Sequence, residues 1–182
     1  MHNPDPAPQD TTTKQPFWKT NWGKNALIVL AIITLYPFIH SWLIQETAKG
    51  PAPDFKVSSI SGKPISLKDY QGQPVLVHFW ATWCEVCEYE RADIEKLAKE
   101  YPVINIAVQS GSNQEVLAFA QKNAMDTDII VNDQNGQLKT LYSTHAVPTS
   151  FVIDSTGNIQ FVQRGYSTYK VLKAKLEGTK QK

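Results

Sequence analysis

Cys84 and Cys87 are the only cysteines in the 182-residue chain, and two residues separate them. The residues before them, 75–80, form an apolar run that predicts a strand buried on both faces. After Cys84 the sequence takes up helical spacing, so we expect a helix that begins at or near this residue. Residues three apart lie on one helix face, and the two sulfurs can therefore meet without unfolding the helix. The spacing is that of an exchangeable dithiol.

The expected helix terminus distinguishes the two sulfur atoms. A helix N-terminus presents unpaired N–H groups and a partial positive charge, which stabilise a thiolate. The thiolate is the form of cysteine that attacks disulfides. We therefore expect Cys84 to be the nucleophile and Cys87 to resolve the mixed disulfide that forms.

Two other interpretations of the pair remain open. Cys-x-x-Cys can supply half of a zinc site, but structural zinc needs four ligands, and His2, His40 and His145 show no ligand spacing near the cysteines. A purely structural disulfide is also open, although so short a loop gains little stability from chain entropy. We expect no metal and no cofactor at this site.

Residues 77–87 resemble the active-site signature of the thioredoxin superfamily, and Trp-Ala-Thr-Trp-Cys at 80–84 resembles its membrane-tethered TlpA/ResA-like thiol-disulfide oxidoreductases. Further motifs are similar to the suppressor of copper sensitivity D type of protein disulfide oxidoreductase; they are Gln-Ser-Gly at 109–111, Val-Asn-Asp-Gln-Asn-Gly at 131–136 and Gly-Tyr-Ser-Thr-Tyr at 165–169. The resemblance spans residues 51–177. It implies an enzyme that exchanges a Cys84–Cys87 dithiol or disulfide with disulfide-containing or thiol-containing periplasmic proteins.

Apolar runs alternate with segments of helical periodicity from residue 55 onward, which predicts an α/β domain. The resemblance supplies the topology of a thioredoxin fold: a central mixed sheet with helices on both faces, an N-terminal β-hairpin and a helix-strand insert at 113–131. The expected strands are 55–60 and 65–67 in the hairpin, then 75–80, 103–108, 129–131, 151–153 and 159–162; the expected helices are 84–101, 113–123, 138–142 and 168–176.

The N-terminal part has a different character. Residues 26–44 contain no Asp, Glu, Lys or Arg, and at about 1.5 Å per residue they nearly span a hydrocarbon core of about 30 Å. Tryptophans flank this segment as interfacial anchors would, and lysines precede it. We therefore expect one transmembrane helix before the thioredoxin-like domain, with the N-terminus of the chain in the cytoplasm.

This topology divides the chain into a disordered cytoplasmic tail at 1–24, a transmembrane anchor at 25–45, a linker at 46–53 and a periplasmic thioredoxin-like domain at 54–182. In a Gram-negative cell the anchor would lie in the inner membrane and the domain in the periplasm, where disulfide chemistry is common. A cleaved signal peptide is an alternative, but no small-x-small cleavage site follows the apolar run. A buried helix of a soluble domain is another, although the run has no polar face.

The charge composition excludes a polyelectrolyte partner. Charged residues make up 19% of the chain and its net charge is +1. No basic stripe is present to follow a phosphate backbone. We therefore expect no binding to nucleic acid.

Two further features are expected beside the dithiol. Trp83 would form a partly exposed apolar platform for substrates, or else pack in the core. The resemblance implies that Pro148 is cis and lies against the dithiol, and that Val147, Pro148 and Thr149 contact an extended substrate. An ordinary trans proline at the start of a strand is the alternative.

His78 stands where thioredoxins carry an aspartate behind the second cysteine. A buried imidazole tends to have a lowered pKa and to stay neutral. A neutral imidazole can take a proton from Cys87 when that thiol attacks the mixed disulfide. A core histidine without a role in the reaction is an equally open interpretation.

Glu85 is expected to tune the thiol pKa. The carboxylate is adjacent to Cys84 and, with Glu88 and Glu90, disfavours a second negative charge. We therefore expect a thiol pKa near or above ~7 and a dithiol that acts as a reductant. The resemblance agrees, because its tethered branch is mostly kept reduced by a membrane electron-transfer protein. A copper-binding or substrate-docking module without turnover is the alternative function.

Overall fold

The computed structural model describes residues 25–26, 28–35 and 50–179. The chain divides into two units, Met1–Glu46 and Thr47–Lys182. In the first unit the described residues are helical, and their large apolar side chains are exposed. Among the described residues, no helix has both the length and the apolar character that a membrane crossing needs. The predicted tail at 1–24, and much of the predicted anchor and linker, lie outside the described residues.

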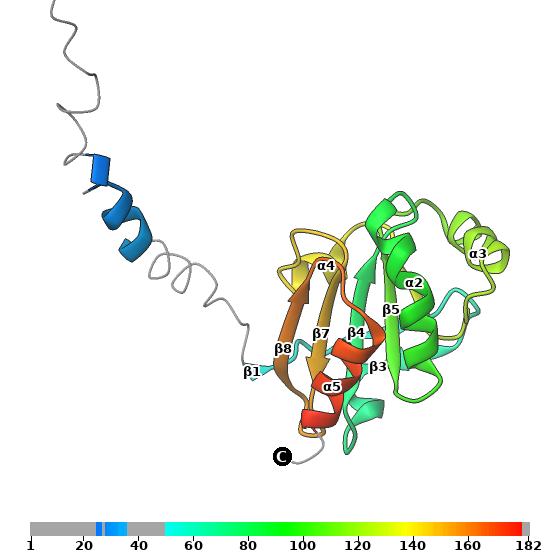
Figure 1. Ribbon diagram of the computed structural model, residues 1–182. Coiled ribbons are helices and arrows are strands. Elements are labelled where there is room, and N and C mark those ends of the chain that lie inside the picture. Colours follow the sequence, from blue (N-terminus) through cyan, green and yellow to red (C-terminus); the bar gives the residue numbers. More distant parts are fainter. Residues whose placement is uncertain (1–24, 27, 36–49, 180–182) are drawn as a thin grey trace, which may run out of the picture. The chain divides into compact units, whose positions relative to one another are not determined.

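The second unit is built on a six-stranded sheet with the strand order β1-β8-β7-β4-β5-β6 (Figure 1). β4, β5 and β6 are parallel, whereas β7 is antiparallel to β4, and β8 is antiparallel to both β7 and β1. The predicted mixed sheet of a thioredoxin fold is therefore confirmed. The strands are β1 (Gly50–Pro51), β4 (Val75–Trp80), β5 (Val103–Val108), β6 (Ile130–Asp133), β7 (Thr149–Ile153) and β8 (Asn158–Arg164).

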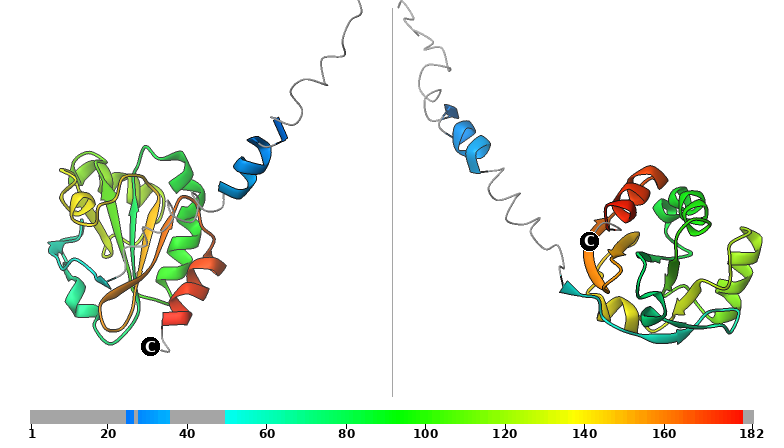
Figure 2. Two further views of the ribbon diagram at one scale, coloured as in Figure 1. Left: turned by 90° about the vertical axis from the view of Figure 1, so that its left-hand side faces the viewer. Right: turned by 90° about the horizontal axis from the view of Figure 1, so that it is seen from below.

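Helices cover both faces of the sheet, as predicted. One face carries α2 (Glu85–Ala98), α3 (Asn113–Lys122) and α5 (Tyr169–Thr179). The other carries α4 (Gln137–Leu141) and the separate hairpin of β2 (Lys56–Ser58) and β3 (Pro64–Ser66), which η1 (Leu67–Tyr70) follows. In the right-hand view of Figure 2, α2 and α5 lie on one side of the sheet and the hairpin on the other. The predicted hairpin and helix-strand insert are both present.

β4 passes through the middle of the core with all of its residues buried. Val75, Val77 and Phe79 pack in a hydrophobic cluster with the hairpin and α4. Leu76 and Trp80 point to the opposite face and pack under the helices. Burial on both faces explains why the strand is an uninterrupted apolar run apart from one histidine. β4 runs from the centre of the core to the N-terminus of α2, and this connection positions the two cysteines.

Most helix and strand bounds differ from the prediction by one to three residues, α2 differs at both ends, and β1 is an additional strand. α2 begins at Glu85, because Cys84 keeps extended backbone geometry and caps the helix. The helix ends at Ala98 instead of near Tyr101, because the chain tightens into i→i−3 hydrogen bonds there. Gly50–Pro51, inside the predicted linker, forms strand β1, because it pairs with the edge of β8. The folded unit therefore includes residues that the sequence assigned to the linker.

Candidate active site

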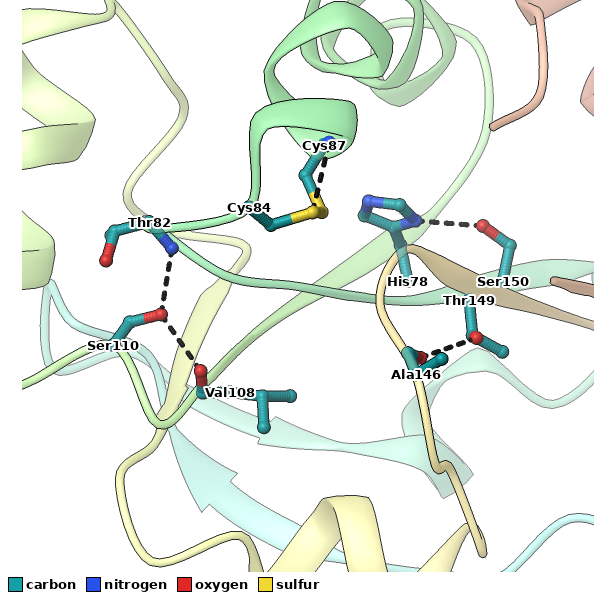
Figure 3. The surroundings of a disulfide bond; sticks show 9 residues. All are labelled: His78, Thr82, Cys84, Cys87, Val108, Ser110, Ala146, Thr149 and Ser150. Atoms are coloured by element: carbon teal, nitrogen blue, oxygen red, sulfur yellow. Dashed lines mark hydrogen bonds between the residues drawn. A yellow bond between two sulfur atoms is a disulfide. The ribbon is translucent and has the colours of Figure 1, made fainter. Parts of the chain in front are cut away.

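Cys84 and Cys87 form a disulfide at the N-terminus of α2 (Figure 3). Cys84 is the N-cap of the helix, and its Sγ accepts a hydrogen bond from the Cys87 backbone N–H at 3.1 Å. Cys84 is partly exposed, whereas only 4% of Cys87 is exposed. A substrate can therefore reach Cys84 first. In the reduced protein the same N–H and the helix terminus stabilise a Cys84 thiolate.

The loop between β5 and α3 holds the residues that lead into the disulfide. Ser110 Oγ accepts a hydrogen bond from the Thr82 N–H at 3.0 Å and donates one to the Val108 carbonyl oxygen at 3.0 Å. The Trp83 indole N–H donates to the Gln109 carbonyl oxygen at 3.1 Å, although 64% of Trp83 is exposed. The indole is thus an exposed apolar surface held in one orientation, at the position where the sequence predicts a substrate contact.

The peptide bond between Val147 and Pro148 is cis, as the family resemblance implies. Thr149 begins β7, and its hydroxyl donates a hydrogen bond to the Ala146 carbonyl oxygen at 2.8 Å. Val147 packs in the same hydrophobic cluster as both cysteines. The structure therefore brings this loop to the disulfide, and its contact with a substrate stays a prediction.

His78 is a buried residue of β4, and its Nδ1 lies 2.8 Å from Ser150 Oγ on the neighbouring strand β7. In Figure 3 the imidazole is drawn between Ser150 and the disulfide, with its other nitrogen on the side away from Ser150. Burial lowers the pKa of His78 to about 3, so the ring is neutral at physiological pH. The Ser150 hydroxyl can donate a hydrogen bond to Nδ1 or accept one from it, so this contact fits either tautomer of the neutral ring. The proton-relay role stays a prediction.

Glu90 is a candidate residue that the sequence interpretation counted only as a negative charge. It lies one helical turn after Cys87 on the buried face of α2 and is 0% exposed. Burial raises the pKa of its carboxyl to about 7; the backbone of Ser167 opposes the rise, and the charge of Asp93 adds to it. A carboxyl that is about half protonated near neutral pH can exchange a proton with a neighbouring thiol. In the sequence, the three-residue spacing between Cys87 and Glu90 is the signal that could have identified Glu90 as a candidate site residue.

The three carboxylates of α2 that the sequence places nearest the dithiol are not equivalent. Arg91 pairs with Glu88 at 2.6 Å between Nη2 and Oε1, and this hydrogen bond lowers the pKa of Glu88. Glu90 is buried and partly protonated. Glu85 is exposed and accepts a hydrogen bond from the Tyr89 hydroxyl at 3.4 Å. Of the three charges that the sequence suggested, the charge of Glu85 is therefore the least compensated.

Metal ligands do not gather in the described part of the chain, where no three His, Cys, Asp or Glu side chains could hold a metal ion. His145 is exposed, and His2 and His40 lie outside the described residues. The expectation of a protein without metal or cofactor therefore stays a prediction.

A central mixed sheet, a disulfide at the N-terminus of the helix after its middle strand, and a cis-proline beside that disulfide define a domain for thiol–disulfide exchange. The model of the AhpC/TSA family matches residues 48–162. The chain belongs to this thioredoxin-like family.

Individual relatives agree with this class. The chain is 36% identical to the thioredoxin-like protein YneN of Bacillus subtilis over 140 residues, which cover 74% of this chain and 80% of YneN. It is 29% identical to the thiol-disulfide oxidoreductase ResA of Geobacillus thermodenitrificans over 168 residues, 86% of this chain and 94% of ResA. The crystal structure of StoA from Bacillus subtilis matches with a TM-score of 0.61 and 28% identity, over 69% of this chain and 98% of StoA. The protein is a thiol-disulfide oxidoreductase, as predicted.

Proposed function

We propose that the protein is a membrane-anchored, periplasmic reductant of disulfides in substrate proteins. The observation that carries the proposal is the asymmetry of the disulfide: Cys84 is accessible at a helix N-terminus, whereas Cys87 is buried behind it. Trp83 and the cis-proline loop beside the pair supply surfaces for an extended substrate.

The reaction follows from this asymmetry. The Cys84 thiolate attacks one sulfur of a substrate disulfide, the substrate S–S bond breaks, and a mixed disulfide forms while the other substrate sulfur leaves as a thiolate. Cys87 then loses its proton and attacks Cys84 Sγ, which releases the second substrate thiolate. The protein ends with the Cys84–Cys87 disulfide and the substrate with two thiols, so two electrons have moved to the substrate. A membrane electron-transfer protein would return two electrons to the disulfide.

The direction of electron flow is tested by the reduction potential. Glu85 disfavours a negative charge on Cys84, and Val86, the other residue between the cysteines, carries no charge. Glu85 thus offsets part of the stabilisation that the helix terminus gives the Cys84 thiolate. A less stabilised thiolate makes a dithiol more reducing, so we expect a potential between about −180 and −270 mV. Equilibration of the full-length protein in detergent with glutathione buffers measures it. A potential more oxidising than about −180 mV would identify an oxidant instead.

The proposed anchor rests on residues 25–45, part of which is described. Residues 28–35 are helical, and their large apolar side chains are each more than half exposed, as Ile28 at 57% and Ile33 at 63% illustrate. Exposure of so many apolar groups to water is unfavourable, and contact with lipid would remove it. The lysines before residue 25 favour a cytoplasmic N-terminus.

The predicted topology has a direct test. A reporter that is active only in the periplasm should be active when it is fused after Lys182 and inactive when it is fused after Thr20. The reverse pattern would overturn the proposed orientation. Release of the protein by osmotic shock would show that the N-terminal segment is cleaved and does not anchor it.

The proposed proton relay through His78 predicts a slower second step. His78→Asn retains a polar side chain of smaller size but has no basic nitrogen, so we expect resolution of the mixed disulfide to slow by about tenfold or more. The first attack should be nearly unchanged, because it needs only the Cys84 thiolate. Rapid-quench single-turnover kinetics separate the two steps. Unchanged resolution in His78→Asn and His78→Ala, with a loss of stability alone, would favour a core histidine.

A copper-binding or substrate-docking module without turnover is the alternative. Reduction of insulin by the full-length protein distinguishes the two functions, because a binding module would not turn over. The similarity of the chain to a thiol-disulfide oxidoreductase favours turnover.

A further inference from the structure

A hollow of about 360 Å³ opens directly beside Cys84, between the first turn of α2 and the end of α3. Trp83, Cys84 and Glu85 form one side of it, and Phe119 and Lys122 of α3 form the other. Its volume falls in the range of sites that hold side chains or small ligands. None of the described residues that line it comes from the cis-proline loop, so it is a separate surface for whatever reaches Cys84.

The two aromatic walls of the hollow are held in place without a substrate. The Trp83 indole N–H donates to the Gln109 carbonyl oxygen at 3.1 Å, and the Gln109 N–H itself donates to the Asp133 carbonyl oxygen at 3.1 Å. Phe119 packs against Trp80 of β4 with ring centroids 5.5 Å apart. Walls that are ordered in advance lose little conformational entropy when an apolar group enters between them.

The two carboxylates that line the hollow, Glu85 and Glu88, differ in how far their charges are paired. Arg91 pairs with Glu88 through two hydrogen bonds, at 2.6 and 3.1 Å, and the nearby charge of Lys122 lowers the pKa of Glu88 further. Glu85 is exposed, and its described contact is the Tyr89 hydroxyl at 3.4 Å. The carboxylate of Glu85 therefore remains available to a cation on a bound molecule.

We propose that this hollow is the subsite for a substrate side chain next to the substrate cysteine, and that it selects a large apolar side chain with a basic neighbour. The proposal rests on the proposed exchange reaction. A mixed disulfide places the substrate sulfur about 2 Å from Cys84 Sγ, and consecutive residues are about 3.8 Å apart, so the residue beside the substrate cysteine must lie over surface that borders Cys84. The apolar group packs between Trp83 and Phe119, and the basic group faces Glu85.

Short peptides closed by one disulfide test the selection. Two peptides differ only in the residue next to one cysteine, which is Phe or Ala. Two further peptides keep Phe at that position and differ in the residue beside the Phe, which is Lys or Asp. The reduced full-length protein in detergent should reduce the Phe peptide with a kcat/KM about tenfold above that of the Ala peptide. It should prefer the Lys peptide to the Asp peptide, and this preference should weaken at high salt. Hydroxyethyl disulfide serves as a substrate without side chains.

Two variants assign the selection to the hollow. Phe119→Ala should bring the Phe-to-Ala ratio close to one, because its loss of rate with the Phe peptide should exceed its loss with hydroxyethyl disulfide. Lys122→Glu, an exposed substitution that leaves the core intact, should enlarge the Lys-to-Asp ratio. Val171→Ala removes an exposed apolar side chain of α5 that does not line the hollow, and it should change neither ratio.

Equal turnover of the Phe and Ala peptides by the parent protein would overturn the subsite and leave thiol–disulfide exchange intact. So would an equal loss with every substrate in Phe119→Ala, or an unchanged charge preference in Lys122→Glu. Failure of the parent protein to reduce hydroxyethyl disulfide or any peptide would instead overturn the proposed function.

Discussion

Cys87→Ser is expected to accumulate a covalent mixed disulfide with substrate, whereas Cys84→Ser is expected to accumulate none. Cys84 is the accessible N-cap of α2, and Cys87 is buried one turn further on. Without the second sulfur the first adduct cannot resolve, because no other cysteine exists in the chain. Without the first, the remaining thiol has neither access nor the helix terminus. Both variants should lose more than about 10³-fold in turnover, as removal of a reacting group usually requires.

Non-reducing electrophoresis after alkylation measures the trapped adducts, and reductant should release them. The double variant with serine at both positions is the control, since it keeps the side-chain size and cannot form any disulfide. Equal trapping by the two single variants would show that either sulfur can attack, which would contradict the assignment of Cys84. Normal folding of each variant can be checked by its thermal unfolding midpoint.

The parts of the fold that follow local pattern were predictable from the sequence. The strands at 75–80 and 103–108 have the predicted bounds, because both are largely apolar runs that follow a proline. The turn residues around Gly62 also predicted the position of the hairpin, whose strands β2 and β3 lie on either side of this glycine. The helix start differed by one residue, because Cys84 uses its sulfur to cap the helix instead of entering it.

Site features that depend on contacts distant in sequence were not predictable in this way. The hydrogen bond from the Trp83 indole N–H to the Gln109 carbonyl oxygen joins residues of two loops, and neither residue type by itself predicts this contact. The pairing of Glu88 with Arg91, in contrast, follows from an i,i+3 spacing that the sequence displays. The sequence prediction counted Glu88 as an unpaired charge and therefore overstated the negative charge near the dithiol.

Glu90 shows the limit most clearly, because its charge state depends on burial. Helical spacing places it on the face of Cys87, but a glutamate is seldom fully buried, so the sequence favours an exposed position. Only packing of α2 against the sheet and the Ser167 segment removes it from water. Because burial raises the pKa of Glu90 to about 7, we expect substitution of Glu90 to have a large effect on both stability and catalysis.

Glu90→Gln is expected to remove a loss of stability that the parent protein undergoes as the pH rises. The folded-state pKa of Glu90, about 7, lies above its ordinary value of 4.5, so the fold binds this proton more tightly than the unfolded chain does. Its stabilising effect is fully present below pH 4.5, falls between pH 4.5 and 7, and is absent above. Between pH 4.5 and pH 8, the advantage of Glu90→Gln over the parent should grow by about 3 kcal/mol.

Urea unfolding of the disulfide form at several pH values measures this difference. Glu115→Gln is a control with the opposite sign, because the Ser112 N–H donates to the Glu115 carboxylate at 2.7 Å and lowers its pKa. Glu115→Gln should therefore be least stable relative to the parent at high pH and recover as the pH falls. A constant difference between Glu90→Gln and the parent at every pH would contradict a titrating Glu90.

The same substitution should slow the second chemical step, because an amide cannot take the proton that Cys87 releases. We expect resolution of the mixed disulfide in Glu90→Gln to slow by about 10²-fold at neutral pH, with the first attack nearly unchanged. In the parent the resolution rate should rise with a midpoint near pH 7, which is the pKa of Glu90. His78→Asn should lower this rate but keep the midpoint, since the pKa of His78 is about 3. A midpoint that persists in Glu90→Gln and disappears in His78→Asn would exchange the roles of the two residues.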